Sequence, residues 1–239
     1  MTKDQGDYVV QLTKQQIDIG LYTNRRQEQL EFWQQAVGLE FDHLGKLGGG
    51  VHQLRHHCHG SIIKVNHTRA PLPGTSPSCL AGLLIARDDV DERRDLKDPD
   101  GNEIALVPSG QNDVVNLALR LRVRDRAASW AFYRNALNFQ DGGGGRLRCG
   151  DSLIVLEEDV EAPQTGARQD LGLRYFTLQI RDCDATHAEV LAAGGYEGSA
   201  PVTLGDTVRY SFVRDPDGNW IELSERATLT GGLIQRGGA

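Results

Sequence analysis

Glu222 is the acidic residue whose sequence neighbours most favour a role in catalysis or binding. It follows a turn at 215–219, Asp-Pro-Asp-Gly-Asn, which leads into a predicted strand at 220–223. Side chains alternate along a strand, so Ile221 and Leu223 share one face while Trp220 and Glu222 share the other. If the sheet buries its apolar face, Glu222 points to the opposite, concave side, where it could act as a general base.

The same turn occurs earlier in the chain, at 98–102, and is followed by Glu-Ile-Ala-Leu at 103–106. Ala105 stands there at the position that corresponds to Glu222. In both turns the proline presets φ and the glycine tolerates a positive φ, and we expect Asp217 and Asn219 to bond their own backbone. The repeat predicts a duplicated unit whose two copies differ at the residue best placed for chemistry.

Other polar side chains of the second half are predicted to line the same cup as Glu222. They are Arg120, Arg122, Tyr175, Gln179 and Trp220. An arginine in such a cup suggests a carboxylate, phosphate or enolate oxygen in the ligand, with Tyr175 as hydrogen-bond donor or general acid. The alternative is that both arginines are solvated and paired with neighbours such as Glu222, and that Trp220 serves packing.

The segment 51–67 is unusual because it holds five of the seven histidines of the chain. Alternation along its second predicted strand, 61–66, places Lys64 and Asn66 on one face. We expect both to line a first-half cup with at least one histidine from 52–59, where Lys64 would neutralise an anion and a histidine such as His57 would move a proton. A solvated hairpin, or a metal site built from His57, His59 and neighbours, are the alternatives.

Asp18 and Tyr22 are candidate substrate-binding residues on a predicted strand at 16–23, opposite the apolar face of that strand. A helix at 24–37 should follow, with Asn24 as its N-cap. The second copy repeats this order, with a strand at 117–123 and a helix at 125–137 capped by Asp125. These elements supply the frame that would position the candidate residues.

The later half of each copy is less regular. A strand at 174–180 precedes a helix through 186–193 that either Asp182 or Asp184 would begin, whereas the strand at 83–86 leads almost at once to Asp98, so the corresponding helix is short or absent. With a linker at 109–113, the expected division is one domain at 8–108, a second at 114–226 and a flexible tail at 227–239.

Composition excludes several classes of function. A net charge of −7 argues against nucleic-acid binding, and no apolar run is long enough for a membrane span. The first residues lack a signal-peptide pattern, so a cytoplasmic location is expected. Four cysteines without C-x-x-C spacing predict reduced thiols rather than a disulfide framework or zinc ribbon.

The motifs together resemble one known superfamily. An Asp-capped helix containing Phe-Tyr at 132–133, a half-repeat ending in Ala-Ala-Gly-Gly at 192–195 and the closing segment 215–223 are similar to the vicinal oxygen chelate superfamily. That group includes glyoxalase I, extradiol dioxygenases and bleomycin-resistance proteins. The resemblance covers nearly the whole chain and is strongest over 117–225. It implies an α+β protein of tandem domains, each with paired βαβββ modules that curl around a cup (the glyoxalase/bleomycin resistance/dihydroxybiphenyl dioxygenase fold).

The resemblance also implies a function. The expected protein is an enzyme of the lyase, isomerase or dioxygenase kind acting on a small, oxygen-bearing anion, or else a non-catalytic small-molecule binding protein of the resistance type. Family members usually hold a divalent metal in the cup, so the resemblance makes a metal possible here, but the cofactor stays unknown because the ligand positions of the family are largely lost. A homodimer is a further expectation, because cups can be shared between subunits.

Carrying over the metal-binding positions leaves few ligands. The second domain offers Ala118, Tyr175, Glu222 and, near by, Glu157; the first offers Asp18, Ala105 and Asn66. No pair of histidines with one carboxylate is present at these positions, and alanine has no donor atom. The sequence therefore predicts that the second domain does not bind a metal tightly in the usual way of the family, with Glu222 the one kept ligand.

Overall fold

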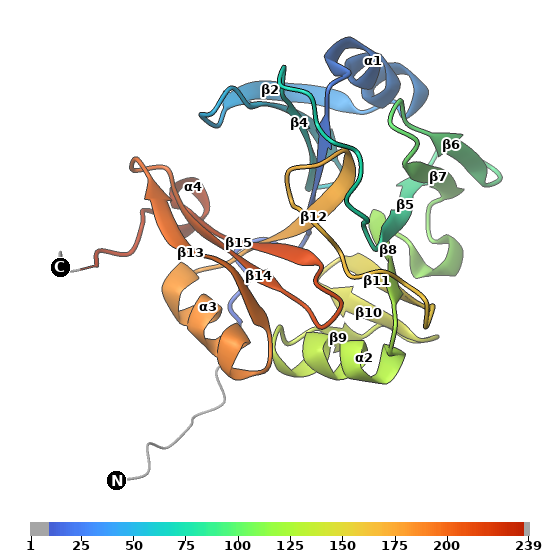
Figure 1. Cartoon of the computed structure of the whole chain (residues 1–239). Coiled ribbons are helices and arrows are strands. Elements are labelled where there is room, and N and C mark those ends of the chain that lie inside the picture. The colour runs from blue at the N-terminus through green and yellow to red at the C-terminus, as the bar shows by residue number, and fades with distance from the viewer. Residues whose placement is uncertain (1–9, 237–239) are drawn as a thin grey trace, which may run out of the picture.

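The computed structural model describes residues 10–236, whose strands form two curved mixed sheets (Figure 1). The first sheet has the order β13-β14-β15-β12-β1-β4-β3-β2. Its strands are β1 (Asp18–Thr23), β2 (Glu40–Lys46), β3 (His52–Cys58), β4 (Ser61–His67), β12 (Gly172–Gln179), β13 (Tyr196–Leu204), β14 (Val208–Arg214) and β15 (Trp220–Arg226).

The second sheet has the order β6-β7-β5-β8-β11-β10-β9. Its strands are β5 (Leu80–Arg87), β6 (Arg94–Lys97), β7 (Glu103–Pro108), β8 (Leu117–Val123), β9 (Gln140–Asp141), β10 (Arg146–Cys149) and β11 (Ser152–Glu158). The combination of helices with these two mixed sheets confirms the predicted α+β class. The apolar faces of both sheets contribute to a single buried core that includes Trp33, Tyr133 and Phe176.

Each sheet draws strands from both halves of the sequence. In the first sheet β1 pairs antiparallel with β12, with Gly20 opposite Tyr175, and in the second sheet β5 pairs antiparallel with β8, with Leu84 opposite Ala118. The sequence interpretation expected one cup for each half, whereas this strand order builds both concave faces from both halves. Pairing between the halves closes strand edges that separate modules would leave open. The domain limits 8–108 and 114–226 remain a prediction, and residues 8 and 9 lie outside the described part.

The repeated turns have the predicted positive φ at glycine, +88° at Gly101 and +80° at Gly218. The residue that closes each turn differs from the expectation. Asp215 Oδ1 accepts from the backbone N–H groups of Asp217 and Asn219, at 3.0 and 2.7 Å, and Asp98 does the same in the earlier copy. The first aspartate of the motif therefore holds the turn, because its side chain reaches forward over the following backbone.

The helices mostly follow the sequence pattern. In α2 (Arg126–Asn135) the Asp125 carboxylate accepts from Ala128 N–H, which confirms the predicted N-cap. In α3 (Cys183–Ala192) Asp182, and not Asp184, is the N-cap. The prediction of Asn24 as a cap was wrong: α1 (Arg26–Glu31), extended by the π-helical turn Phe32–Ala36, has no side-chain cap. The Asn24 amide instead bonds the backbone at 68–72 and so fixes the loop after β4.

The connection between β5 and β6 contains no helix, as predicted. Beyond β7 come the 3-10 turn Gln111–Asp113 and, after β15, the short helix α4 (Ala227–Thr230). The tail, predicted to be flexible, is anchored as far as Arg236, whose guanidinium bonds Asp182 at 2.9 Å and Glu225 at 2.6 Å. Residues 237–239 lie outside the described part.

The four cysteines are buried and free, as the sequence predicted. Burial raises the pKa of Cys58, Cys149 and Cys183 to about 12, so these thiols stay protonated and unreactive. Within residues 10–236, no helix is long and apolar enough to cross a membrane.

Candidate functional site

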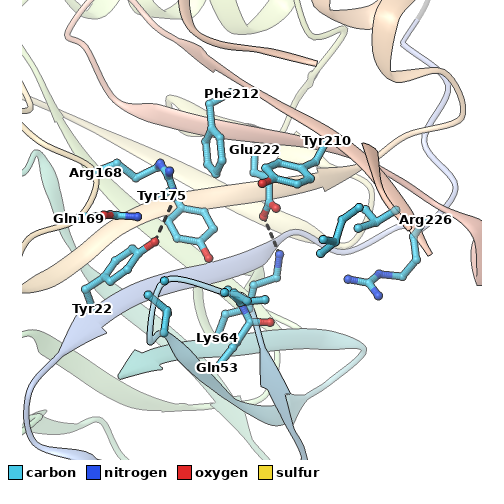
Figure 2. Close-up of a pocket in the computed structure, with 16 residues that line it drawn as sticks. Tyr22, Gln53, Lys64, Arg168, Gln169, Tyr175, Tyr210, Phe212, Glu222 and Arg226 are labelled. Carbon is cyan, nitrogen blue, oxygen red and sulfur yellow. Dashed lines mark hydrogen bonds and ion pairs between the residues drawn. The ribbon is translucent and has the colours of Figure 1, made fainter. Parts of the chain in front are cut away.

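A cavity of about 320 Å³ opens on the concave face of the first sheet (Figure 2). The residues that line it come from β1, β3, β4, β12, β13, β14 and β15, from the loop between β2 and β3 and from the loop before β12. The polar and aromatic ones are Tyr22, Gln53, Lys64, Arg168, Gln169, Tyr175, Tyr210, Phe212, Glu222 and Arg226. Because β1 and β12 pair at the centre of the sheet, the cavity combines residues from both halves of the chain.

The floor of the cavity is an ion pair between Lys64 and Glu222. Lys64 Nζ lies 2.7 Å from Glu222 Oε2 and donates to Thr177 Oγ1 at 2.7 Å, while the Thr177 hydroxyl donates to Glu222 at 2.6 Å. Burial opposes ionisation of Glu222, but the Lys64 ammonium and the hydrogen bonds from Lys64 and Thr177 outweigh it, so the pKa of Glu222 lies below its ordinary value. The carboxylate is therefore ionised at neutral pH.

Asp18 lies beneath this pair and is fully buried. Its carboxylate pairs with Lys14, accepts from Gln179 Nε2 at 2.9 Å and from Ile62 N–H at 2.8 Å, and lies 3.9 Å from Lys64 Nζ. Burial raises the pKa of Asp18, but the charges of Lys64 and Lys14 together outweigh that effect and lower the pKa below its ordinary value. Asp18 therefore stays ionised as well. Asp18 and Gln179, predicted to bind substrate, thus support Lys64 from below rather than line the cavity.

The ring of Tyr175 packs against β1 at Gly20. A Cβ atom on Gly20 would lie 2.0 Å from Tyr175 Cζ, so only glycine leaves room for the ring. The Tyr175 hydroxyl accepts from Asn66 Nδ2 at 3.1 Å, and Asn66 in turn accepts from Gln53 at 2.9 Å. Burial, with the Glu222 charge added, raises the pKa of Tyr175 well above its ordinary value. Its neutral hydroxyl can therefore donate a hydrogen bond into the cavity.

One wall of the cavity is aromatic and carries a cation. The Arg168 guanidinium lies 4.1 Å from the centre of the Phe212 ring and donates to Tyr22 Oη at 3.1 Å. Phe212 also contacts Tyr175 and Tyr210 edge to face. This wall suits a flat or apolar ligand body with an electron-rich group near Arg168.

The structure separates residues that the sequence interpretation had grouped. Arg120 and Arg122 lie on β8 in the second sheet and cannot share a cup with Glu222. Arg120 pairs with Glu157 at 2.6 Å and with Glu103 at 2.9 Å, so it is paired with neighbouring acids, as the alternative had it, but Glu222 is not one of them. The reason is that β8 and β15 stand in different sheets, which alternation along a strand does not reveal. The concave face around β8 is filled by Ala105, Ala118 and other apolar side chains.

The histidine prediction also needs correction. Lys64 and Asn66 do share the cavity, but no histidine of the described residues lines it; Gln53 is the residue of β3 that does. His57 is 52% exposed and lies 3.7 Å from Asp42, while His59 contacts the carbonyl of Ala86. Strand β3 presents its odd-numbered residues to the cup, and those paired with Asn66 and Lys64 are Gln53 and Arg55.

Trp220 lies beside the cavity rather than in it. Its indole N–H donates to Gly166 O at 2.8 Å, and the Arg214 guanidinium lies 4.7 Å from its ring centre. These contacts make Trp220 a packing residue that holds the loop bearing Arg168.

The donor set of the cavity does not fit a divalent metal. The positions carried over from the family, Asp18, Asn66, Tyr175 and Glu222, do converge here. However, the Lys64 ammonium lies between the two carboxylates and repels a cation, and neutral tyrosine and amide oxygens are weak ligands for transition metals. Glu157, the other candidate ligand, is paired with Arg120 on the second sheet.

A further group of acids consists of Asp182 and Asp184 at the start of α3 and Glu225 of β15, none of which lines the cavity. Among the described residues it is the one group of three potential ligands found close together. Arg236 pairs with all three acids and Arg209 with Asp184, so arginine side chains already neutralise this cluster.

Sequence reasoning missed several residues of the cavity. Arg226 shares a strand face with Glu222, so alternation could have found it. Arg168 and Gln169 lie in a loop without periodic pattern. No signal in the sequence places that loop over the first sheet.

Comparisons with known proteins agree with this architecture. Residues 114–223 match the sequence model of the Glyoxalase/Bleomycin resistance protein/Dioxygenase superfamily, and a search of curated proteins gives no match. Glyoxalase I from Zea mays is similar in structure with a TM-score of 0.69 and 15% identity, covering 88% of this chain and 92% of that one. A mutant of the same enzyme gives 0.70 at 14% identity, covering 89% and 94%.

A provisionally assigned dioxygenase from Bacillus subtilis subsp. subtilis str. 168 has a TM-score of 0.65 and 13% identity, with 95% of this chain and 92% of that one covered. At such identities these likenesses establish the fold over almost the whole chain, beyond the half that the sequence model matches. The motifs, the sequence match and the shared fold lead to one conclusion: residues 114–223 match the glyoxalase/bleomycin resistance protein/dioxygenase superfamily, also known as the vicinal oxygen chelate superfamily, and almost the whole chain has the fold of glyoxalase I.

Proposed function

We propose that the chain is an enzyme of the lyase or isomerase kind that moves a proton at a carbon beside a carbonyl in a small organic anion, without a metal. The observation that carries this proposal is the contact between Lys64 and Glu222 on the floor of the cavity, at 2.7 Å. An ammonium group and a carboxylate side by side supply the two elements of enolisation, a positive charge for the oxygen and a base for the proton.

Lys64 would stabilise the developing enolate oxygen, the role that the metal serves in other members of the superfamily. Asp18 and Thr177 hold the ammonium in place, so little reorganisation is needed as charge develops. Tyr175, kept neutral by its environment, would donate a second hydrogen bond to the same oxygen. In comparable sites, each such donor lowers the free energy of the transition state by on the order of 3 kcal/mol.

Glu222 would act as the base. In the free protein Lys64 and Thr177 lower its pKa and so weaken it as a base. A substrate oxygen that binds Lys64 takes a share of the ammonium charge, which raises the basicity of Glu222 at the moment the proton is removed. The substrate thus releases the base from its ion pair.

The alternative, a non-catalytic protein that binds the same kind of anion, would use the same cavity. The inferred partner in either case is a small molecule. A cytoplasmic location and a homodimer stay predictions from the sequence.

Proton exchange separates the two functions. A panel of small 2-oxo acids in D₂O, followed by proton NMR, should show loss of the signal of the hydrogens next to the carbonyl in the presence of wild-type protein. Glu222→Gln and Lys64→Met should abolish this exchange, while Glu103→Gln, which removes an exposed acid on the second sheet, should not. Saturable binding without exchange would favour the non-catalytic alternative.

A further inference from the structure

We infer that Arg226 forms a second anion-binding subsite in the same cavity, so that the ligand carries a carboxylate at some distance from the oxygen bound by Lys64. This inference rests on the proposed function only in that an anionic oxygen binds at Lys64. The ligand would be a small molecule with two acidic groups joined by a short aliphatic chain.

The first observation is that the Arg226 guanidinium has no protein partner. Among residues 10–236 no carboxylate pairs with it and no side chain or carbonyl accepts from it, although its Nε atom is buried. Arg168, the other arginine that lines the cavity, donates to Tyr22 and stacks on Phe212. A desolvated charged donor without an acceptor is costly, so an unpaired guanidinium at the wall of a cavity indicates an anion that comes from outside.

The second observation is a like charge close by. Arg55 on β3 is only 8% exposed and bonds Gln53 Oε1 at 2.8 Å and Asp42 at 3.4 Å. Burial lowers the pKa of Arg226, and the neighbouring Arg55 charge lowers it further. The charges of Glu222, Asp18 and Asp42 raise it, but the net shift is downward. Two partly desolvated guanidinium groups are stabilised together by one anion between or beside them.

The third observation is the spacing along β15. Arg226 follows Glu222 by four residues on the same strand, so their side chains share a face and their Cα atoms lie about 13 Å apart. Figure 2 shows the Arg226 guanidinium pointing back toward Lys64 across the cavity. The apolar side chains of Leu204 and Val208 also line this part of the wall. The arrangement suits two charged ends joined by methylene groups.

The experiment uses unreactive dicarboxylates as probes, one carboxylate standing for the substrate oxygen at Lys64. Isothermal titration with succinate, glutarate and adipate should identify one preferred length. The preferred acid should bind about 10- to 100-fold more tightly than its own monoamide, the range expected for one charge-assisted hydrogen-bonded contact. Equal affinity for acid and monoamide, or no binding of any dicarboxylate, would overturn the inference.

Arg226→Met should remove the preference for the dicarboxylate and leave the affinity for the monoamide unchanged, whereas Arg226→Lys should keep part of the preference. The control Arg93→Met, at an exposed ion pair with Asp95, should behave as wild type. Lys64→Met should weaken acid and monoamide alike. If Lys64→Met leaves binding intact while Arg226→Met abolishes the preference, the subsite stands and the proposed function fails.

Thermal unfolding gives a second readout that does not depend on a ligand. Methionine keeps the apolar stem of Arg226 and removes the unpaired charge, so the ligand-free Arg226→Met protein should melt higher than wild type, by about 2–6 °C. The same variant should lose the rise in melting temperature that the preferred dicarboxylate gives to wild type. A lower melting temperature for the free variant would show that Arg226 has a structural partner and would overturn the inference.

Discussion

Gly20→Ala is the substitution whose effect follows most directly from the geometry of the site. A Cβ atom at this position would lie 2.0 Å from Cζ and 2.1 Å from Cε1 of Tyr175, far inside van der Waals contact. The ring is buried against Tyr22 and Phe212 and cannot simply tilt away. We therefore expect Tyr175 to leave its place and its hydrogen bond with Asn66 to break.

The magnitude can be worked out from two opposing effects. Overpacking of a buried site costs about 1–3 kcal/mol, and loss of the Asn66 bond adds about 1 kcal/mol. Alanine in a strand is otherwise more favourable than glycine by roughly 0.5–1 kcal/mol, and the φ of Gly20 is not in the positive region that would require glycine. Gly20→Ala should thus destabilise wild type by about 1–3 kcal/mol.

A double-mutant cycle with Tyr175→Ala tests this reasoning. Without the ring there is no clash, so Gly20→Ala should stabilise the Tyr175→Ala protein slightly, and the coupling between the two sites should be about 2–4 kcal/mol. Urea unfolding of the four proteins measures it. Additive effects, or a destabilisation of the same size in both backgrounds, would refute the steric explanation.

Three further predictions concern charged and titrating groups. Lys64→Met should cost about 3 kcal/mol in urea unfolding, because Glu222 loses its counter-ion and Asp18 keeps only Lys14. The double variant Lys64→Met/Glu222→Gln should cost less than the sum of the single changes, and additivity would contradict the ion pair. Burial lowers the pKa of His56 to about 4 in the folded protein, below its ordinary value of 6.5. The unfolded state therefore binds the proton first, and the free energy of unfolding falls as the pH drops from about 6.5 to 4. His56→Phe should remove up to about 3 kcal/mol of that loss, and an unchanged pH profile would contradict the burial of a neutral ring. Burial raises the pKa of Asp170, but hydrogen bonds from the backbone at 74–76 and 171 outweigh it and hold that pKa at about 2. The contribution of Asp170 to stability is therefore present above about pH 4 and is lost as the pH falls toward 2. Asp170→Asn should be less stable than wild type at pH 6 and approach it near pH 2, as acid titration followed by circular dichroism would show.

The site also shows why a repeat does not by itself locate a cavity. Glu222 and Ala105 occupy corresponding turns, and the copy with alanine contributes to an apolar concave face. Gene duplication can supply two cups of the same shape, and the side chains then decide which one binds a ligand. Here the polar residues of the first and last modules meet in one cup, while those of the middle modules form the Arg120 ion pairs beside the filled one.

The amino-acid sequence by itself determined the superfamily resemblance, the α+β class, most elements and the faces of their residues. Strand alternation correctly placed Lys64 and Asn66 on one side of β4, and the Asp125 cap followed from local hydrogen-bonding chemistry. These features depend on neighbours in the chain, so a local pattern is enough to specify them.

Only the tertiary structure decided which faces meet. Arg120 and Glu222 each lie opposite the apolar face of their strands, but the two strands belong to different sheets. Lys64 and Glu222 come from opposite halves of the chain, yet their charged groups lie 2.7 Å apart. The pairing of β1 with β12 brings them together, and that pairing joins residues 150 or more positions apart. Alternation fixes the face of a side chain but carries no information about the partner strand, because partner choice depends on how all the edges and apolar faces are buried together.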